Sequence, residues 1–321
     1  MDKSVANRYI PIGMMLFALF FGAGNLIFPA SMGQSAGANV WYALLGFCIT
    51  GVGLPLLSIM AVGYSGCGDL QEAASRVHPW YGLFFTFVAY SAIGPCFAIP
   101  RTGTVAFEIG VVPFLSQDQL ALGLPIFLAG FFLVNFWLSA SPQKLVDRIG
   151  RILTPALVLT ILLLIIQSFI SPLGEPQAPS KAYATPVVAA VQGVLDGYNT
   201  LDAIAAFVFA TLIIDVVREE CHLTNPSEIT RQVYKSGAIA VILLAAIYIF
   251  IAKIGAESVP AIGMQPTGAP VLAESAKILF GNVGAIILSV IVLLACLSTA
   301  IGLTTCCAAY FLKLTKCLNY V

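Results

Sequence analysis

The sequence predicts an all-α integral membrane protein, a bundle of several membrane-spanning helices. Of the 321 residues, 59% are hydrophobic and only 9% are charged, whereas about a quarter of the residues of a soluble domain are charged. The mean hydropathy is +0.95. The apolar residues form runs of about 20 residues or more, the length a helix needs to cross the ~30 Å hydrocarbon core. These runs lack the alternation of barrel strands, so a water-soluble fold and a β-barrel are both excluded.

The charged and metal-binding residue types exclude several functions. The 15 basic and 15 acidic residues balance, so no net field favours nucleic acid as a partner. The eight cysteines show no metal-ligand spacing and lie mostly inside apolar runs, and His78 and His222 are far from them in the sequence. No nucleophile and base pair stands on the apolar runs. We therefore expect a protein that is not an enzyme and has no metal cofactor.

The length of the apolar runs predicts eight spans. The first run is long, is interrupted by glycines and lacks a cleavage site, so we interpret it as a span and not as a signal peptide. Residues 268–280 are too short and too polar to cross, and we expect an amphipathic helix over the outer face. The predicted spans are residues 9–33, 38–63, 81–110, 122–140, 148–171, 187–216, 231–253 and 282–312.

The lysines and arginines predict the orientation. Cytoplasmic segments of membrane proteins carry an excess of these residues. With the N-terminus in the cytoplasm, 11 of the 15 fall on the cytoplasmic side. The other four are Arg101, Lys181, Lys253 and Lys277.

The first predicted span is interrupted near mid-membrane depth by Gly22, Gly24 and Asn25. Glycine costs about 1 kcal/mol in a helix interior, and asparagine prefers local backbone bonds. We expect the helix to open there and to form a binding site, because lipid offers no partners to the freed backbone groups. The alternative is a glycine-rich surface for close helix packing.

The sixth span has a second interruption, with Asp196, Gly197 and Asp202 in apolar sequence. A carboxylate at the bilayer centre costs about 2.5–3.5 kcal/mol, so it normally faces a cavity or a partner charge. If a second half-helix starts near Asn199, Asp202 lies in its first turn. The alternatives are a capping or packing role for Asp202 and a solvated position for Asp196 at the outer mouth.

The eighth span carries hydroxyl groups in apolar sequence. Ser298 and Thr299 share a helix face with the carbonyl of Ala295, whereas Ile301 points outward. Three oxygen atoms on one face suit a hard cation, although both hydroxyls could instead bond back to carbonyls of their own helix. Interrupted spans at positions one and six are typical of inverted-repeat transporters.

Four segments make the sequence resemble a known family. Residues 15–29, 94–102, 197–203 and 294–302 resemble the branched-chain amino acid:cation symporter family, the carrier system II transporters of bacteria. The resemblance extends over nearly the whole chain. It implies import of leucine, isoleucine and valine across the bacterial cytoplasmic membrane, driven by Na⁺ or H⁺ as the coupling ion. A channel, or a transport-inactive sensor of the same fold, is the alternative.

The resemblance also implies the leucine transporter-like fold, in which two five-helix repeats have inverted topology. Residues 1–321 would form a single transporter domain, with residues 1–171 as the first repeat and 187–321 as part of the second. Because members of the family have about twelve spans, we expect this chain to hold the first eight.

The same resemblance implies two sets of site residues. Sodium is favoured over protons because hydroxyls and carbonyls outnumber titratable groups at the cation site. Small-molecule amino acids and lipid are the partners expected, and nucleic acid is not. The cation would be held by Ala18, Phe21, Ala295, Ser298 and Thr299. The amino acid would meet Ala23, Gly24, Asn25, Tyr198, Asn199, Thr200 and Asp202, and its side chain a pocket lined by Tyr90, Ser91 and Ile93.

Overall fold

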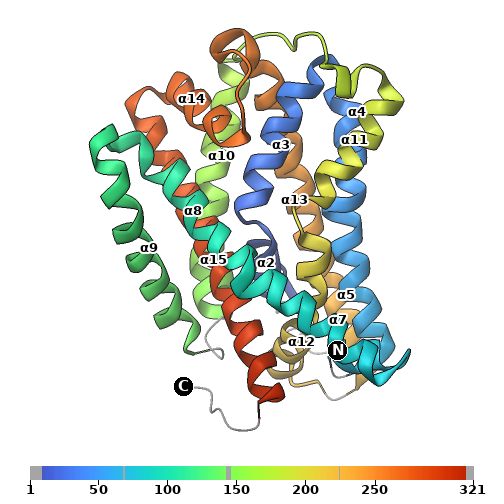
Figure 1. The fold of residues 1–321 in the computed structure, drawn as a ribbon. Helices are drawn as coiled ribbons and strands as arrows, with labels where there is room; N and C mark the ends of the chain where they lie inside the picture. Colours follow the sequence, from blue (N-terminus) through green and yellow to red (C-terminus); the bar gives the residue numbers. More distant parts are fainter. Residues whose placement is uncertain (1–8, 68, 142–145, 224, 316–321) are drawn as a thin grey trace.

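The computed structural model describes residues 9–67, 69–141, 146–223 and 225–315, which form a helical bundle without a strand (Figure 1). The first half contains α2 (Tyr9–Phe20), α3 (Ala23–Ala36), η1 (Gly37–Asn39), α4 (Val40–Cys48), η2 (Ile49–Gly53), α5 (Leu54–Ser65), α6 (Leu70–Ser75), α7 (Pro79–Ser91), η3 (Ala92–Cys96), α8 (Ala98–Gly110), η4 (Val112–Phe114), α9 (Gln117–Ser139), η6 (Val146–Leu153) and α10 (Thr154–Ile170). The second half contains η7 (Lys181–Tyr183), α11 (Pro186–Tyr198), α12 (Asp202–Cys221), α13 (Pro226–Ile262), α14 (Gly268–Phe280) and α15 (Asn282–Leu314).

The first span is broken where the glycines predict it. Helix α2 ends at Phe20 and α3 begins at Ala23. Gly22 caps α3 in an extended conformation, and its amide donates to Oδ1 of Asn25 at 3.0 Å. The asparagine thus satisfies a backbone group that the break has freed, as the lipid environment requires. The predicted opening of the first span is confirmed.

The sixth span is also broken, at residues 199–201, where α11 and α12 meet with a bend of 41°. Leu201 caps α12 with a left-handed φ of 68°, a conformation that costs a residue with a side chain about 1–2 kcal/mol. The second half-helix starts at Asp202 and not near Asn199. Asp202 nevertheless lies in its first turn, as predicted.

The third span has a break that the sequence analysis did not predict. Gly94 has a non-helical backbone (φ −84°, ψ −121°) and is followed by Pro95. Proline lacks the amide hydrogen of the helical ladder and clashes with the preceding turn. The predicted span over 81–110 lies within the candidate span Pro79–Phe114, which is kinked at this point. Because α8 begins again at Ala98, Arg101 lies in its first turn and lines a cavity inside the bundle.

Six helices are long and apolar enough to cross a bilayer, or seven if α11 and α12 count as one span. The 12-residue α2 is a shorter apolar helix, and Figure 1 shows the chain turning between α3 and α4. The predicted count of eight therefore stays a prediction. Residues 268–280 do form a helix, α14, with Val271, Leu272 and Ala276 buried and Glu274 and Lys277 exposed.

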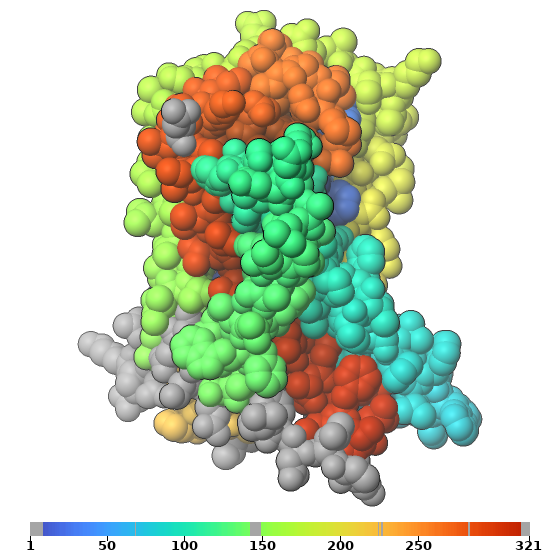
Figure 2. All heavy atoms as spheres, turned by 60° about the vertical axis from the view of Figure 1, so that its left-hand side comes forward, coloured from blue at the N-terminus to red at the C-terminus, as the bar shows by residue number. Residues whose placement is uncertain are grey.

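The outer surface of the bundle carries large apolar side chains, whereas helices inside it pack through small residues. Helix α9 stands on the outside (Figure 2) and exposes Leu122, Leu133 and Trp137. Inside, α4 and α11 pack through glycines: a Cβ atom built at Gly46 would lie 1.9 Å from the carbonyl oxygen of Ala190. Small residues let helix backbones approach in this way.

Candidate functional site

The two broken spans meet at one buried cluster of polar side chains. The side-chain amide of Asn25, in the first turn of α3, donates to the carboxylate of Asp202 and to the hydroxyl of Tyr248 on α13. Tyr248 in turn donates to Oδ2 of Asp202 at 3.2 Å. Their exposed fractions are 2% for Asn25, 4% for Asp202 and 0% for Tyr248. Each group in this triangle has a partner, which buried polar groups require.

Arg101 brings a positive charge to the same place. Its Nη2 donates to the carbonyl oxygen of Thr200 at 3.3 Å, and its guanidinium carbon lies 5.3 Å from the centre of the Phe97 ring. A Cβ atom at Gly24 would lie 2.9 Å from Nη2, so the missing side chain at Gly24 lets the guanidinium approach α3. The break in the sixth span is therefore held by a charged group from the third.

The cavity between these elements is small. Its volume is about 30 Å³, far below the 300–1,000 Å³ of pockets for drug-sized ligands. Polar groups of Gly24, Asn25, Arg101, Thr200 and Asp202 face apolar ones across it. The apolar lining comes from Leu19, Phe20, Ala23, Ile93, Ala98, Leu201, Ala205 and Leu303.

These groups are suited to a zwitterion with an apolar side chain. The amino end of α3 points a positive helix terminus at the cavity, and Arg101 adds a guanidinium, which binds carboxylates in a fork. The Asp202 carboxylate offers an acceptor for an ammonium group. Both signs of charge are present within one apolar enclosure, where such contacts are strongest.

Oxygen atoms of α2 and α15 gather beside the first break. The Ser298 hydroxyl bonds to the carbonyl of Ala18 at 2.8 Å and to that of Ala295 at 3.0 Å. The Thr299 hydroxyl bonds to the carbonyl of Leu19 at 3.0 Å and approaches that of Ala18 at 3.4 Å. The hydroxyls therefore connect two helices and do not only bond back to their own.

This oxygen cluster fits a hard monovalent cation, because carbonyl and hydroxyl oxygens are the ligands such ions take. Among the residues that the structure describes, no three His, Cys, Asp or Glu side chains come together. Of the predicted cation ligands, the structure brings Ala18, Ala295, Ser298 and Thr299 together. Phe21 instead contacts Phe17: its amide donates to the Phe17 carbonyl at 2.7 Å, and the two rings are stacked with centres 5.3 Å apart.

The predicted substrate residues fall into two groups. Ala23, Gly24, Asn25, Thr200 and Asp202 line the central cavity, and Ile93 joins them. The structure does not bring the others there. Tyr198 and Asn199 are exposed, Tyr198 lines a groove with α5 and α7, Tyr90 lines a different cavity, and Ser91 is only partly buried and lines neither.

The outward direction of Tyr198 has a physical cause. A Cβ atom at the preceding Gly197 would lie 2.4 Å from the Phe47 carbonyl oxygen, so this face of α11 is pressed against α4 and the next residue must point elsewhere. The expectation that Ile301 points outward is also wrong, for a similar reason. Ile301 is 1% exposed, because α15 is surrounded by other helices at that level.

Arg101, Thr102 and Tyr248 are cavity or network residues that the sequence analysis did not select. Gly94-Pro95 is a signal for the break that places Arg101. An arginine seven residues later, in an apolar run, is a second signal. Tyr248 stands in a continuous apolar helix, α13, and only its partners in space single it out.

Comparison with known proteins identifies the family of the chain. A family model described as "Branched-chain amino acid transport protein" matches residues 5–321. The chain is 48% identical over 321 residues to the branched-chain amino acid permease BrnQ of Bacillus subtilis, covering all of this chain and 72% of that protein. It is 46% identical to the permease BraB of the same organism over 97% of this chain and 69% of that protein.

A more distant relative is the branched-chain amino acid transport system 2 carrier protein of Pseudomonas aeruginosa, which is 38% identical over 94% of this chain and 68% of its own length. The match to the family model, over residues 5–321, includes all the segments that build the central cavity. The chain belongs to the family of branched-chain amino acid transport proteins, which are membrane carriers and not enzymes.

Proposed function

We propose that this protein imports leucine, isoleucine and valine by symport with Na⁺ or H⁺, through alternating access around the broken first and sixth spans. The observation that carries the proposal is the Asn25, Asp202 and Tyr248 triangle, which joins the two breaks at one buried point. Half-helix ends of this kind bind substrate and coupling ion in inverted-repeat transporters. The names of the relatives support the substrate class.

In this proposal the amino acid lies between α3, α8 and α12. Its carboxylate meets the amino end of α3 and the Arg101 guanidinium, and its ammonium group meets Asp202. The branched side chain packs on Phe20, Ile93 and Leu303. Such a pocket separates substrates that differ by one methylene by only about 1–3 kcal/mol, which favours acceptance of all three branched-chain amino acids.

A space of about 30 Å³ cannot hold leucine. The amino acid enters only if the α2–α3 pair and the α11–α12 pair move apart. Because Asn25 and Asp202 join these pairs, their bond would break on one side of the transport cycle and form again on the other. This supports alternating access of the inverted-repeat kind. The proposed eight spans and cytoplasmic N-terminus rest instead on the lengths of the apolar runs and on the distribution of lysine and arginine.

The coupling ion in this proposal is Na⁺, bound among the oxygens of Ala18, Ala295, Ser298 and Thr299. The ion would replace the hydrogen bonds that now join α15 to α2. Its binding would fix the end of α2 next to Gly22, where a Cβ atom would lie 2.8 Å from the Thr299 hydroxyl. Ion and substrate sites would then share the first break.

Transport by the purified chain in proteoliposomes tests the proposal. An inward Na⁺ gradient, an inward H⁺ gradient and no gradient are compared for uptake of radiolabelled leucine. We expect radiolabelled leucine to accumulate above its external concentration with either gradient. We also expect its uptake to be faster when unlabelled leucine is inside. Flux that only follows the leucine gradient, with no acceleration by exchange, would indicate a channel, and binding without flux would indicate a sensor.

A further inference from the structure

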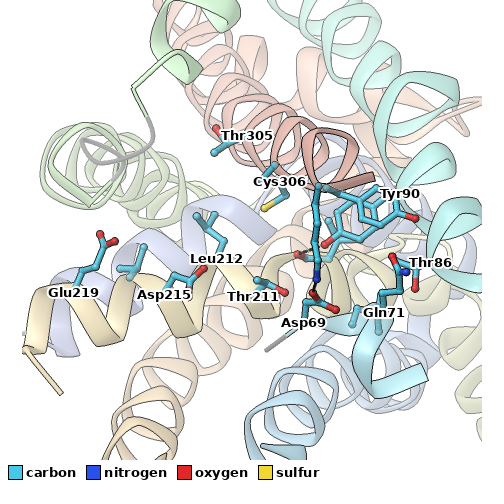
Figure 3. A pocket seen from close by; sticks show the side chains of 16 residues that line it. Asp69, Gln71, Thr86, Tyr90, Thr211, Leu212, Asp215, Glu219, Thr305 and Cys306 are labelled. Atoms are coloured by element: carbon cyan, nitrogen blue, oxygen red, sulfur yellow. Dashed lines mark hydrogen bonds and ion pairs between the residues drawn. The ribbon is translucent and has the colours of Figure 1, made fainter. Parts of the chain in front are cut away.

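A second, larger cavity lies next to the central one, at the other end of α12. Its volume is about 270 Å³, slightly below the 300–1,000 Å³ of pockets for drug-sized ligands and therefore suited to a smaller molecule. Figure 3 shows side chains of α12 and α15 pointing into it. It is lined by Asp69, Leu70, Gln71, Thr86, Tyr90, Val208, Thr211, Leu212, Asp215, Val216, Glu219, Thr305, Cys306, Ala309, Tyr310 and Lys313.

The two cavities share two helices. Asp202 faces the central cavity and Val208 the second one, and the two are six positions apart on α12, a rise of about 9 Å. On α15, Thr299 and Thr305 are related in the same way. An amino acid leaving the closed central cavity along these helices therefore meets the second cavity next.

Three buried hydroxyl groups in this cavity lack hydrogen-bond partners among the described residues: those of Thr86, Thr211 and Tyr310. Thr86 is 0% exposed and Tyr310 is 7% exposed. An unsatisfied buried hydroxyl costs free energy, and its presence in a native structure calls for a missing partner. Three such groups around one space indicate a polar ligand.

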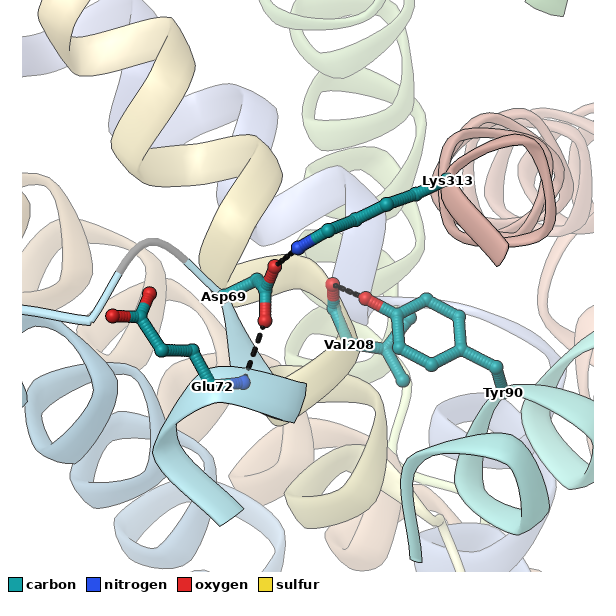
Figure 4. Close-up of polar contacts among 5 residues, drawn as sticks. All are labelled: Asp69, Glu72, Tyr90, Val208 and Lys313. Carbon is teal, nitrogen blue, oxygen red and sulfur yellow. Dashed lines mark hydrogen bonds and ion pairs between the residues drawn. The ribbon is translucent and has the colours of Figure 1, made fainter. Parts of the chain in front are cut away.

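Charges of both signs stand at the rim. Asp215 and Glu219 follow each other on one face of α12, and Asp215 also pairs with Arg218 at 3.4 Å on its exposed side. Across the cavity, the Lys313 ammonium at the end of α15 pairs with Asp69 (Figure 4). Asp69 accepts a second bond from the Glu72 amide at 2.8 Å.

The walls between these rims are apolar and aromatic. The Tyr90 and Tyr310 rings are stacked with centres 4.2 Å apart, and the Tyr90 hydroxyl donates to the Val208 carbonyl at 3.4 Å. Leu212 and Val216 complete the apolar wall on α12. An aliphatic side chain fits such a wall, while its two charged ends fit the rims.

We infer that this cavity is a second binding site for an aliphatic amino acid, occupied between the central site and the solution at this end of the bundle. The ammonium group would meet Asp215 and the Thr211 hydroxyl. The carboxylate would meet Lys313 and the Tyr310 hydroxyl, in competition with Asp69. The inference rests on the proposed function, since the ligand is the transported one.

Counting bound leucine tests the inference. Equilibrium binding of radiolabelled leucine to the purified chain in lipid nanodiscs is expected to saturate at two molecules per chain. Thr86→Val with Thr211→Val removes two unsatisfied hydroxyls without changing shape, so folding is retained. Losing one hydrogen bond to a charged ligand group weakens binding about tenfold or more, so binding at the second cavity is expected to weaken by that factor and binding at the central cavity to stay unchanged.

A variant that fills the second cavity, compared with a control on the neighbouring residue, distinguishes loss of this site from a general effect of a larger side chain on α15. Ala309→Trp fills the cavity and should leave one leucine per chain. Ala308→Leu, on the neighbouring residue that does not line it, should leave two. Asp202→Asn should weaken leucine binding at the central cavity. Ala309→Trp should still remove the leucine bound at the second cavity when it is combined with Asp202→Asn.

The outcomes distinguish the two proposals. Binding of one leucine in the wild type, unchanged in Ala309→Trp and in the valine pair, would overturn the second site and leave the proposed function standing. Absence of leucine binding to the wild-type chain would overturn both.

Discussion

Asn25 and Asp202 are 177 residues apart in the chain, yet the side-chain amide of the first donates to the carboxylate of the second inside the bundle. Each stands in the first turn of the half-helix that follows a break. The contact therefore reports the relative position of the two broken spans, and it has to change if those spans separate.

Asp202→Asn removes the charge and keeps the shape. The new amide oxygen can still accept from Asn25 and Tyr248, so the fold should persist. A bond to a charged group contributes about 1.5–3 kcal/mol, so we expect leucine uptake in proteoliposomes to fall at least about tenfold. Asp196→Asn is the control, because Asp196 bonds to Tyr183 and Gln192 away from the cavity.

Unchanged leucine uptake by Asp202→Asn over the full range of Na⁺ concentration and pH would remove Asp202 from the site. Equal losses in Asp202→Asn and Asp196→Asn would instead indicate a general cost of removing an intramembrane carboxylate.

Thr299→Ala tests the cation cluster. The Thr299 hydroxyl is one of the oxygens between α15 and α2, and its loss should raise the Na⁺ concentration for half-maximal leucine uptake about tenfold, if one ligand contributes about 1.4 kcal/mol. Thr160→Ala is a matched control, since among the described residues the Thr160 hydroxyl bonds to carbonyls of its own helix, those of Ala156 and Leu157, each at 2.9 Å.

A Na⁺ response that is the same for Thr299→Ala and Thr160→Ala would exclude Thr299 as a ligand. A wild type that follows a pH gradient and ignores Na⁺ would exclude the sodium site as a whole.

Local sequence signals predict an all-helical membrane bundle and two of the three breaks described above. Glycine, asparagine and aspartate in apolar runs are costly wherever they fall, so Asn25 and Asp202 can be found without a structure. The residues that complete the site cannot be found in this way. Tyr248 lies in an unbroken helix, and Arg101 depends on where α8 restarts after Gly94.

Directions around a helix were harder to predict than positions along it. Tyr198 points away from the cavity because Gly197 is pressed against α4, and Ile301 is buried because α15 is covered on all sides at that level. Both depend on the packing of helices distant in sequence, which periodicity in an almost uniformly apolar segment does not reveal.

Arg101→Gln tests which end of the substrate the guanidinium binds. If Arg101 holds the carboxylate, the variant should bind leucine at least about tenfold more weakly, the effect of losing one charge-assisted contact. Leucinol, which has no carboxylate, should inhibit the variant as strongly as it inhibits the wild type. Inhibition of labelled leucine uptake by both compounds measures this.

Arg76→Gln is the control for Arg101→Gln, because Arg76 also donates to a backbone carbonyl, that of Ser65 at 2.8 Å, but far from the cavity. An equal loss of leucine and leucinol inhibition in Arg101→Gln would show that Arg101 supports the break and does not contact the carboxylate.

The contact between α4 and α11 predicts which glycines the fold cannot replace. A Cβ atom at Gly193 would lie 1.9 Å from the Ala43 carbonyl oxygen, whereas one at Gly130 on α9 would meet nothing within 4 Å. Gly193→Ala should separate the helices and lower thermal stability. Gly130→Ala should raise stability by about 1 kcal/mol or less, the helix preference of alanine. Thermal unfolding in detergent measures both, and similar midpoints would contradict the close contact.

The ion pair of Asp69 and Lys313 predicts a pH response outside the membrane. Burial alone would raise the pKa of Asp69, but the Lys313 ammonium and the Glu72 amide hold it below its usual value. A carboxyl group whose pKa is lowered by folding stabilises the protein above its unfolded pKa, about 3.9, and loses that effect as the pH falls through the lower folded value. The difference in thermal stability between wild type and Asp69→Asn should therefore be constant from pH 8 to about pH 5 and shrink below about pH 4. A difference that disappears between about pH 7 and pH 5 would show that the pair does not hold Asp69 ionised.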